Sequence, residues 1–336
     1  MAPLHGPPET AREKVMPASK ILEFTSPSLS YGSANVSVQI LPRDSNRAPR
    51  ISWNVGGRPL YRTDQVKLFE SLHFDVCRTT IYSDCGLDAG RDGVSAGRDG
   101  MHAGRKCAAL ATPEHLAPVF LLWPDVSFDV NVEGVDAGRN VDGDAANPVP
   151  EIPLMDGSAL PFFLALRREA GVPEEIRFYD APVSRQWDLR NAPDQPSYGY
   201  VRIEPSEAFE VEYRLDRPDA NGFKSCAALS VYGPEDLYGV FQARTFILEK
   251  EYEQARRAGL LAGATESCGL LVKSPVDKSL YRVPEEPAMH KILDLIGDLS
   301  FVRPALPKIR VEILNGGHAS HHQILKEVLP YLLKVV

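Results

Sequence analysis

The feature that most constrains the fold is the order in which strand-like and helix-like stretches follow one another. In each half of the chain, apolar and polar residues first alternate with a period of two, then recur at helical spacing, and then alternate again. A doubly wound parallel sheet would instead alternate strands and helices one by one. The order therefore predicts an α+β protein of two layered domains. The expected strands are residues 20–24, 33–41, 50–55, 79–82, 128–132, 177–179, 200–203, 209–215, 268–273 and 309–313, and the expected helices are residues 63–72, 161–170, 249–258, 290–298 and 321–333.

One predicted boundary divides the chain. Its 336 residues are enough for two ordinary domains, each able to bury a core of its own. Gly171, Val172 and Pro173 end a predicted helix, because glycine often follows a helix C-terminus and proline stops its continuation. We therefore expect an N-terminal domain at residues 19–173 and a C-terminal domain at residues 174–336.

Three segments have compositions that cannot bury much apolar surface. Residues 1–18 are rich in proline and polar residues, and we expect a disordered tail there. Residues 86–105 and 136–147 are rich in glycine and aspartate, and we expect two mobile surface insertions. A glycine-rich loop can also cradle phosphate, but neither segment has the spacing of a P-loop or of a dinucleotide fingerprint.

Composition and charge narrow the classes of function. Asp and Glu number 45 against 37 Lys and Arg, and the net charge of -8 argues against a protein that binds nucleic-acid backbones. The cysteines are odd in number and form no C-x-x-C pair, so we expect free thiols in a reducing compartment and a cytoplasmic protein. Since no apolar run reaches the length of about 20 residues that spans a bilayer, we expect no transmembrane segment.

Read as a helix, residues 290–298 place three polar side chains on one face. At about 100° per residue, His290, Asp294 and Asp298 fall within a sector of roughly 80°, each one turn from the next. A histidine and an aspartate four residues apart can bind one metal ion, and their nitrogen and oxygen atoms suit zinc. Gly297 is expected to leave free space beside the imidazole. The alternative is an ordinary amphipathic helix with a solvated polar face.

Residues 112–116 predict the start of another helix. Thr112 is a good N-cap, and Pro113 suits the first helical position. Glu114 then falls in the first turn, where the helix dipole favours a negative charge. On this motif alone, Glu114 can simply match the dipole and His115 can be a half-buried neighbour.

Five segments occur in the order found in the UDP-3-O-acyl-N-acetylglucosamine deacetylase (LpxC) family, which the chain resembles over roughly residues 21–333 outside the two insertions. One such segment would be a weak signal, but five in the same order are specific. The resemblance implies two α+β domains whose helices pack between two sheets, with a zinc site at the domain interface. The segments are residues 112–116, 151–159, 243–246, 290–298 and 317–319.

By this resemblance, the zinc ligands are His115, His290 and Asp294. Three protein ligands leave a coordination position for water, as a hydrolytic zinc site requires. Glu114 matches the family's general base, and His318 matches the group that stabilises the oxyanion and protonates the leaving amine.

The same resemblance implies supporting roles for four further residues. Asp298 would orient and charge the imidazole of His318, and Thr245 resembles a hydroxyl donor to the oxyanion. Lys291 and Phe246 match residues that contact the substrate. For Lys291 and Thr245, an ordinary structural role is the alternative.

Three residues near these motifs are not expected to take part in the chemistry. His321 and His322 lie one turn beyond His318, and because the ligand set is already complete we expect them on the surface or behind the site. Cys268 is at a position that carries cysteine in the family. Its apolar neighbours favour packing over a nucleophile.

The chain departs from the family where the substrate would bind. Ile247, Leu248, Glu249 and Tyr252 occupy the region that lines the family's passage for a fatty acyl chain, and Glu266 stands where an aromatic residue is usual. Burying Glu249 or Glu266 against an alkyl chain would cost several kcal/mol without a partner. We therefore expect the passage to be short, closed or polar. Further departures are Ser30 for a usual histidine, Arg217-Pro218 for His-Pro, and Met289 for a basic residue.

These observations lead to three hypotheses of function. The first is a zinc-dependent N-deacetylase of the UDP-3-O-acyl-N-acetylglucosamine type in lipid A biosynthesis, acting as a monomer with peripheral contact to an acylated substrate. The second is a related deacylase of another N-acyl compound in a specialised pathway. The third is a non-catalytic paralogue that binds a nucleotide sugar, although a pure binder would not need Glu114 and His318.

Overall fold

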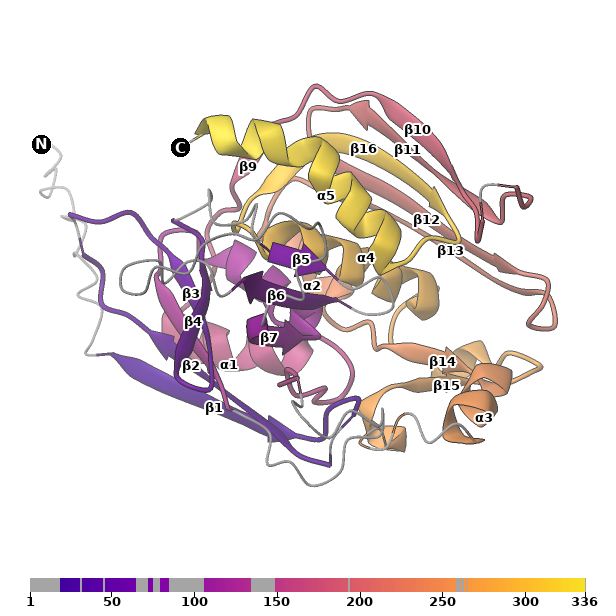
Figure 1. Ribbon diagram of the computed structural model, residues 1–336, viewed down its shortest axis with the longest axis horizontal. Coiled ribbons are helices and arrows are strands. Elements are labelled where there is room, and N and C mark those ends of the chain that lie inside the picture. The colour runs from indigo at the N-terminus through magenta and orange to yellow at the C-terminus, as the bar shows by residue number, and fades with distance from the viewer. Residues whose placement is uncertain are drawn as a thin grey trace, which may run out of the picture.

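A computed structural model describes residues 19–30, 32–44, 46–64, 72–74, 79–84, 106–133, 149–192, 194–257, 261, 263 and 265–335 (Figure 1). The predicted tail at residues 1–18 and the predicted insertions at residues 86–105 and 136–147 lie outside these residues, as does most of the helix expected at residues 63–72.

A five-stranded sheet forms the N-terminal layer, in the order β1-β2-β8-β3-β4. β1 pairs with β2 in antiparallel orientation, which confirms the predicted hairpin. Every second side chain of β2 is buried, so one face of the sheet packs on the core. The strands are β1 (Lys20–Ser26), β2 (Ala34–Ile40), β3 (Ile51–Val55), β4 (Arg58–Arg62) and β8 (Phe128–Val132).

A smaller sheet leads into the first part of the site. Its strands β5 (Leu72–Phe74), β6 (Thr80–Asp84) and β7 (Lys106–Ala111) pair in antiparallel orientation. Two buried 3-10 helices follow, η3 (Pro113–His115) and η4 (Ala117–Leu122). The predicted helix at residues 161–170 is confirmed as α1 (Leu160–Ala170).

The C-terminal layer is a mixed sheet in the order β10-β11-β16-β12-β13, and β9 pairs with β16. β10 and β13 are not among the strands predicted from the sequence. Most side chains of β10 are exposed, and the centre of β13 consists of small residues, so neither strand has a strong apolar alternation. The strands are β9 (Phe178–Asp180), β10 (Arg185–Leu189), β11 (Gly199–Pro205), β12 (Phe209–Arg217), β13 (Phe223–Val231) and β16 (Leu306–Leu314).

A small unit projects beside this sheet. β14 (Phe246–Leu248) pairs in parallel with β15 (Leu270–Val272), and α3 (Glu249–Arg257) follows β14 directly, as expected for residues 249–258. Of the short helical segments, η6 (Glu266–Cys268) contacts β15, whereas α2 (Leu237–Val240) contacts α4 and η5 (Pro234–Asp236) contacts β13. A further short helix, η7 (Lys278–Leu280), precedes α4 in the chain.

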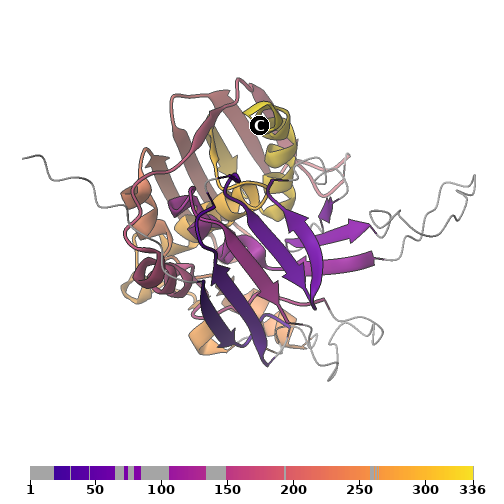
Figure 2. The same ribbon diagram turned by 90° about the vertical axis from the view of Figure 1, so that its left-hand side faces the viewer.

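α4 (Glu286–Ser300) lies between the two large sheets, with α5 (His318–Leu332) and η8 (Leu333–Val335) beside it (Figures 1 and 2). α4 contacts β12, β13 and α5 on one side and η3 and η4 on the other. Its polar stripe is therefore buried, with exposed fractions of 1% for His290, 2% for Asp294 and 1% for Asp298. The alternative of a solvated polar face is wrong.

One hydrophobic core continues through both halves of the chain. Trp53 of β3 lies 4.9 Å from the ring of Phe301, and the Tyr61 hydroxyl donates to the carbonyl of Val302 at 3.0 Å. These contacts hold the end of α4 against the N-terminal sheet. The α+β prediction is confirmed, and the division of the chain at residue 173 stays a prediction.

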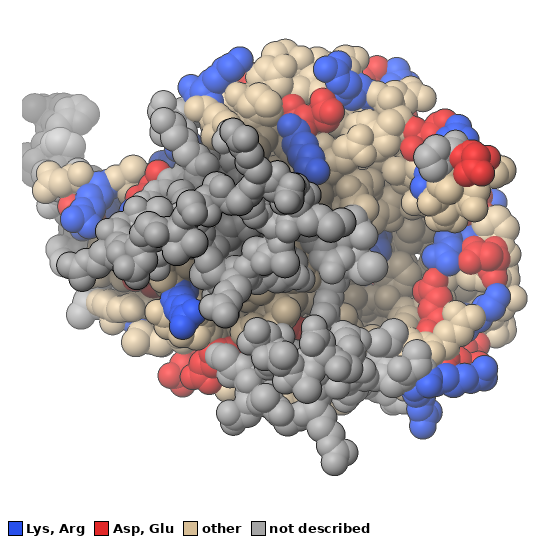
Figure 3. Space-filling model, viewed as in Figure 1, with Lys and Arg blue, Asp and Glu red and all other residues tan. Residues whose placement is uncertain are grey.

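On the described surface seen in Figure 3, Lys and Arg side chains lie among Asp and Glu side chains. Many of them form exposed ion pairs, such as Arg202 with Glu204 and Arg190 with Asp188. None of the helices in the described part of the chain has the length and apolar character needed to cross a bilayer.

Candidate active site

Two elements far apart in sequence bring together three side chains that could hold a metal ion. His290 and Asp294 lie one turn apart on α4, with Nε2 of His290 3.2 Å from Oδ1 of Asp294. His115 of η3 faces the same oxygen, with its Nε2 at 3.6 Å. One donor atom from each residue lies within 4.8 Å of the other two, and all three residues are buried. Two imidazole nitrogens and a carboxylate oxygen so arranged fit a divalent metal ion.

The orientation of His290 suits a metal ligand. Its Nδ1 lies 3.0 Å from the carbonyl oxygen of Ala243, which can only accept a hydrogen bond. Nδ1 therefore carries the proton, and the lone pair of Nε2 faces His115 and Asp294. The role of Ala243 could not be predicted from the sequence, because any residue type carries a backbone carbonyl.

Asp294 is held in its ionised form. Burial acts to raise the pKa of this carboxyl group, but His290 and Lys291 outweigh burial and hold the pKa well below its usual range. The ammonium group of Lys291 lies 2.9 Å from Oδ2, which leaves Oδ1 facing the two histidines.

Glu114 presents a buried carboxylate to this cluster. Its Oε2 has no hydrogen-bond partner among the described residues, which is uncommon for a buried oxygen and indicates a place for a ligand such as water. Burial raises the pKa of Glu114 to about 7, although His318 and His115 act to lower it. This orphaned oxygen and the adjacent donor atoms together fit a metal centre with a bound substrate.

The turn that carries Glu114 differs from the predicted helix start. Thr112 has a φ of 58° and no capping hydrogen bond, and its hydroxyl donates instead to the carbonyl of Ala111 at 2.8 Å. The predicted N-cap is therefore wrong, and η3 is a single 3-10 turn. A non-glycine residue in the left-handed region stores strain, and such strain often lies at functional sites.

Gly297 also has a role different from the predicted one. A Cβ at this position would meet the backbone of Glu114 rather than open space. The glycine thus lets α4 approach η3 closely, and it does not leave room beside the imidazole of His290.

His318 lies at the first position of α5, with its imidazole between two sets of acids. Nδ1 is 2.8 Å from Oδ2 of Asp298, whereas Nε2 is 4.0 Å from Oε1 of Glu114 and 4.0 Å from Oδ2 of Asp294. Burial acts to lower the pKa of His318, but Asp298 and Glu114 outweigh it and raise the pKa to about 9. The imidazole is therefore charged at neutral pH.

Asp298 has more partners than the sequence suggested. Thr79, just before β6, donates its hydroxyl hydrogen to Oδ1 at 2.5 Å, and Nδ1 of His321 lies 2.8 Å from Oδ2. His322 and His321 are both buried, so the surface position considered for them is wrong and a position behind the site is confirmed. No local pattern could identify Thr79, which is 219 residues from Asp298 in sequence.

The predicted substrate-contacting residues lie at the edge of the cluster. Lys291 lies with its ammonium group 5.8 Å from the centre of the Phe246 ring. Thr245 is two residues beyond Ala243, and its backbone N–H donates to the carbonyl of Gly157 at 2.6 Å. Lys291 lies on α4 with Phe246 beside it, and the roles of Lys291, Phe246 and Thr245 stay predictions.

An apolar cavity of about 170 Å³ adjoins Thr245 and Phe246. Ile247 and Tyr252 line it as expected for an acyl passage, whereas Glu249 lines a different cavity with Lys224 and Lys273. Glu249 therefore does not line this apolar cavity, and the side chain of Glu266 lies outside what the structure describes. The lining consists of Leu29, Leu154, Thr245, Phe246, Ile247, Tyr252, Leu261, Thr265, Cys268, Gly269, Leu270 and Leu271.

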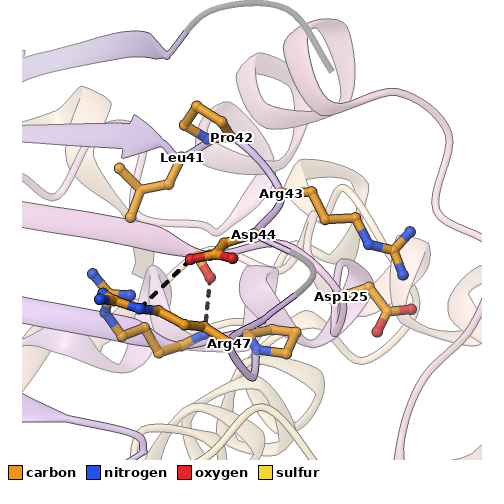
Figure 4. Close-up of a pocket in the computed structure, with 9 residues that line it drawn as sticks. Leu41, Pro42, Arg43, Asp44, Arg47 and Asp125 are labelled. Atoms are coloured by element: carbon orange, nitrogen blue, oxygen red, sulfur yellow. Dashed lines mark hydrogen bonds and ion pairs between the residues drawn. The ribbon is translucent and has the colours of Figure 1, made fainter. Parts of the chain in front are cut away.

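A separate hollow of about 140 Å³ lies in the loop after β2 and contains none of the predicted site residues. Figure 4 shows the side chain of Asp44 beside Arg47 in this hollow, where the two form an ion pair of 3.5 Å. Asp125, at its edge, pairs with Arg177 at 2.5 Å.

Known proteins resemble the chain over most of this site. The model of the family described as "LpxC: UDP-3-O-acyl N-acetylglycosamine deacetylase" matches residues 141–330, which include every site residue on α4 and α5 but not Glu114 or His115. The structure places these two residues beside the matched region, with His115 next to Asp294 and Glu114 next to His318.

Curated relatives carry the name UDP-3-O-acyl-N-acetylglucosamine deacetylase. The protein of Anaeromyxobacter dehalogenans is 31% identical over 204 residues, which are 58% of this chain and 61% of the relative. That of Coxiella burnetii is 30% identical over 184 residues, 54% of this chain and 59% of the relative. That of Synechocystis is 27% identical over 222 residues, 66% of this chain and 74% of the relative. The chain thus spans about three fifths of the first relatives it matches. Because the family model covers more than half of the chain, the protein belongs to the LpxC family of UDP-3-O-acyl N-acetylglycosamine deacetylases.

Proposed function

We propose that the chain is a zinc-dependent amide hydrolase that removes the N-acetyl group from a UDP-3-O-acyl-N-acetylglucosamine-like sugar. The observation that carries this proposal is the buried cluster of His115, His290 and Asp294, with Glu114 and His318 beside it. The names of the relatives support the substrate class. By the same resemblance, the reaction would belong to lipid A synthesis in the cytoplasm and be carried out by a monomer.

Zinc held by these three ligands would supply a Lewis acid for the amide carbonyl and for the attacking water. Glu114 takes the proton of that water on Oε2, the buried oxygen with no partner among the described residues. A pKa of about 7 lets the carboxyl group accept and release a proton at neutral pH.

His318 gives a proton to the leaving nitrogen. Because Nδ1 is bound to Asp298, the Nε2–H is the group directed toward Glu114 and Asp294. As the C–N bond breaks, this proton goes to the amine and acetate is released. Thr245 donates a hydrogen bond to the oxyanion, a contribution typically of about 2.7 to 4 kcal/mol.

The substrate extends from the metal centre past Lys291 and Phe246. Lys291 is available for sugar hydroxyls or diphosphate oxygens on the side that Asp294 does not occupy. The adjacent apolar cavity is suited to the start of a 3-O-acyl chain, since its lining contains no Asp, Glu, Lys or Arg among the described residues.

An amine-release assay tests this function. The zinc-loaded protein is compared on UDP-N-acetylglucosamine with and without a 3-O-acyl chain, and we expect faster release from the acylated sugar. Equal rates would favour a deacylase of another N-acyl compound. Binding of either sugar without amine release would favour a non-catalytic nucleotide-sugar protein.

A further inference from the structure

Asp298 accepts hydrogen bonds from more side chains than the proposed reaction uses. His318 and His321 each place Nδ1 2.8 Å from Oδ2, and Thr79 donates to Oδ1 at 2.5 Å. His321 has an exposed fraction of 0% and Asp298 of 1%, so water does not compete for these contacts. His321 therefore binds the same oxygen atom as the proposed catalytic histidine.

Helix geometry explains this arrangement. His318 and His321 are three residues apart on α5, so their side chains lie on the same face, with ring centres 5.6 Å apart. Asp298 reaches toward that face from α4. Both imidazoles bind Oδ2 through Nδ1, so the carboxylate is held by two histidines and its rotation is restricted.

The hydrogen bonds assign a proton to each nitrogen of His321. A carboxylate can only accept, so Nδ1 must carry the hydrogen that it gives to Asp298. Nε2 lies 3.1 Å from the hydroxyl oxygen of Tyr213, which can donate to it. Burial raises the pKa of Tyr213 well above its usual value, so this hydroxyl keeps its hydrogen. Both ends of the buried ring are then satisfied in one tautomer.

We propose that His321 is a positioning residue, whose Nδ1–H holds the carboxylate of Asp298 in the orientation that directs His318 at the substrate. The kinetic consequence rests on the proposed deacetylase function, whereas the hydrogen bond itself exists without substrate. Asp298, Thr79 and Tyr213 form the rest of the network, and within the described residues His321 is the side chain that shares Oδ2 of Asp298 with His318.

Three replacements of His321 distinguish the hydrogen bond at Nδ1 from the hydrogen bond at Nε2. In His321→Asn, the amide nitrogen stands near the place of Nδ1 and keeps the donor to Asp298. In His321→Gln, the amide reaches the place of Nε2 and keeps only the Tyr213 end. His321→Phe retains the volume and removes both hydrogen bonds.

We expect kcat to fall about 10- to 100-fold in His321→Gln and His321→Phe, as is usual when a partner of a site residue is lost, and less than about tenfold in His321→Asn. KM and zinc content should change little in all three. Val38→Ala, in the core of the N-terminal sheet, serves as a control that lowers stability without touching the network. A purely structural role would reduce kcat equally in all three His321 variants, and full kcat in His321→Phe would also overturn the proposal.

Imidazole nitrogen NMR of the wild-type protein tests the hydrogen bond apart from activity. We expect His321 to show a protonated Nδ1 and an unprotonated Nε2 at neutral pH. A proton on Nε2 alone would overturn the proposal. If the wild-type protein released no amine from any acylated sugar, the proposed function would fail, and this spectrum would still decide whether His321 donates to Asp298.

Discussion

Gly297 and Glu114 lie in backbone contact. A Cβ built on Gly297 would stand 2.1 Å from the carbonyl oxygen of Glu114 and 2.7 Å from its Cα. This close approach joins α4, which carries His290 and Asp294, to the turn that carries Glu114 and His115. The contact between the backbones of Gly297 and Glu114 therefore brings the two parts of the candidate site together.

We expect Gly297→Ala to lower both stability and activity. Inside an unhindered helix, alanine would stabilise by roughly 0.5 to 1 kcal/mol. Here the new methyl group must displace η3 or α4, and overpacking of this kind costs about 1 to 3 kcal/mol. Urea unfolding and amine release measure the two effects. Gly239→Ala in α2 is the matched control, because a Cβ there meets no atom within 4 Å, and equal behaviour of both variants would contradict the steric argument.

How much of the fold can be predicted from the sequence depends on how far apart in the chain the interacting residues lie. The polar stripe at residues 290–298 identified a helix that the structure extends to Glu286–Ser300, since helical spacing is a local signal. β13 was not predicted, because Ser225, Cys226 and Ala227 hardly alternate in polarity, and its place depends on pairing with β12. Long-range pairing of this kind has no local signature.

Within the site, too, local motifs could be predicted and long-range contacts could not. The predicted His115, His290, Asp294 and His318 lie near one another, but Thr79, just before β6, and Tyr213 of β12 also reach the network and were not predicted. His321 was predicted to lie on the surface or behind the site, and only the packing of α5 on α4 decides between these positions. Thr112 was assigned the wrong role because its left-handed φ depends on the surrounding chain.

We expect the protein to bind about one zinc ion per chain, as a site with three such ligands does. His290→Ala should lose the metal, because it removes a nitrogen that lies 3.2 Å from Asp294. Glu114→Ala should keep the metal and lose turnover. Elemental analysis after dialysis measures the zinc, and a wild-type protein that holds none would contradict the metal assignment.

Activity should follow a bell-shaped dependence on pH. Glu114 acts without its proton, so kcat/KM rises as the pH passes its pKa of about 7, which the charge of bound zinc would move lower. His318 acts with its proton, so kcat/KM falls as the pH passes about 9. Measurement of kcat/KM across these pH values locates both the rise and the fall. In the residual activity of His318→Gln the alkaline limb should be absent, and its persistence would assign that limb to another group.

The ion pair of buried Glu286 with half-buried Arg244 should make stability depend on pH. Burial acts to raise the pKa of Glu286, but hydrogen bonds from Arg244 and from backbone N–H groups outweigh it and lower the pKa below 4.5. The contribution of Glu286 is therefore full above pH 4.5 and is lost as the pH falls through the lowered pKa.

Replacement of this glutamate tests the same pair. Glu286→Gln leaves Arg244 without its charged partner and should cost about 3 kcal/mol near neutral pH, with a smaller difference from wild type in acid. Chemical unfolding at several pH values measures this. Glu253→Gln, in an exposed pair with Arg257, should change stability by less than about 0.5 kcal/mol. If the stability difference between Glu286→Gln and wild type did not change with pH, the charge of Glu286 would not be its cause.

A larger side chain in the apolar cavity should raise KM for the acylated substrate alone. Leu271→Trp would fill part of the cavity of about 170 Å³ and displace methylene groups of the acyl chain. Each methylene lost from an apolar site weakens binding by about 0.8 kcal/mol, or about fourfold in KM. KM for the sugar without an acyl chain should stay unchanged. Val276 lines the separate cavity that also contains Glu249, so Val276→Trp is the matched control. It should change KM for neither sugar. Equal effects of Leu271→Trp on both sugars would place the acyl chain elsewhere.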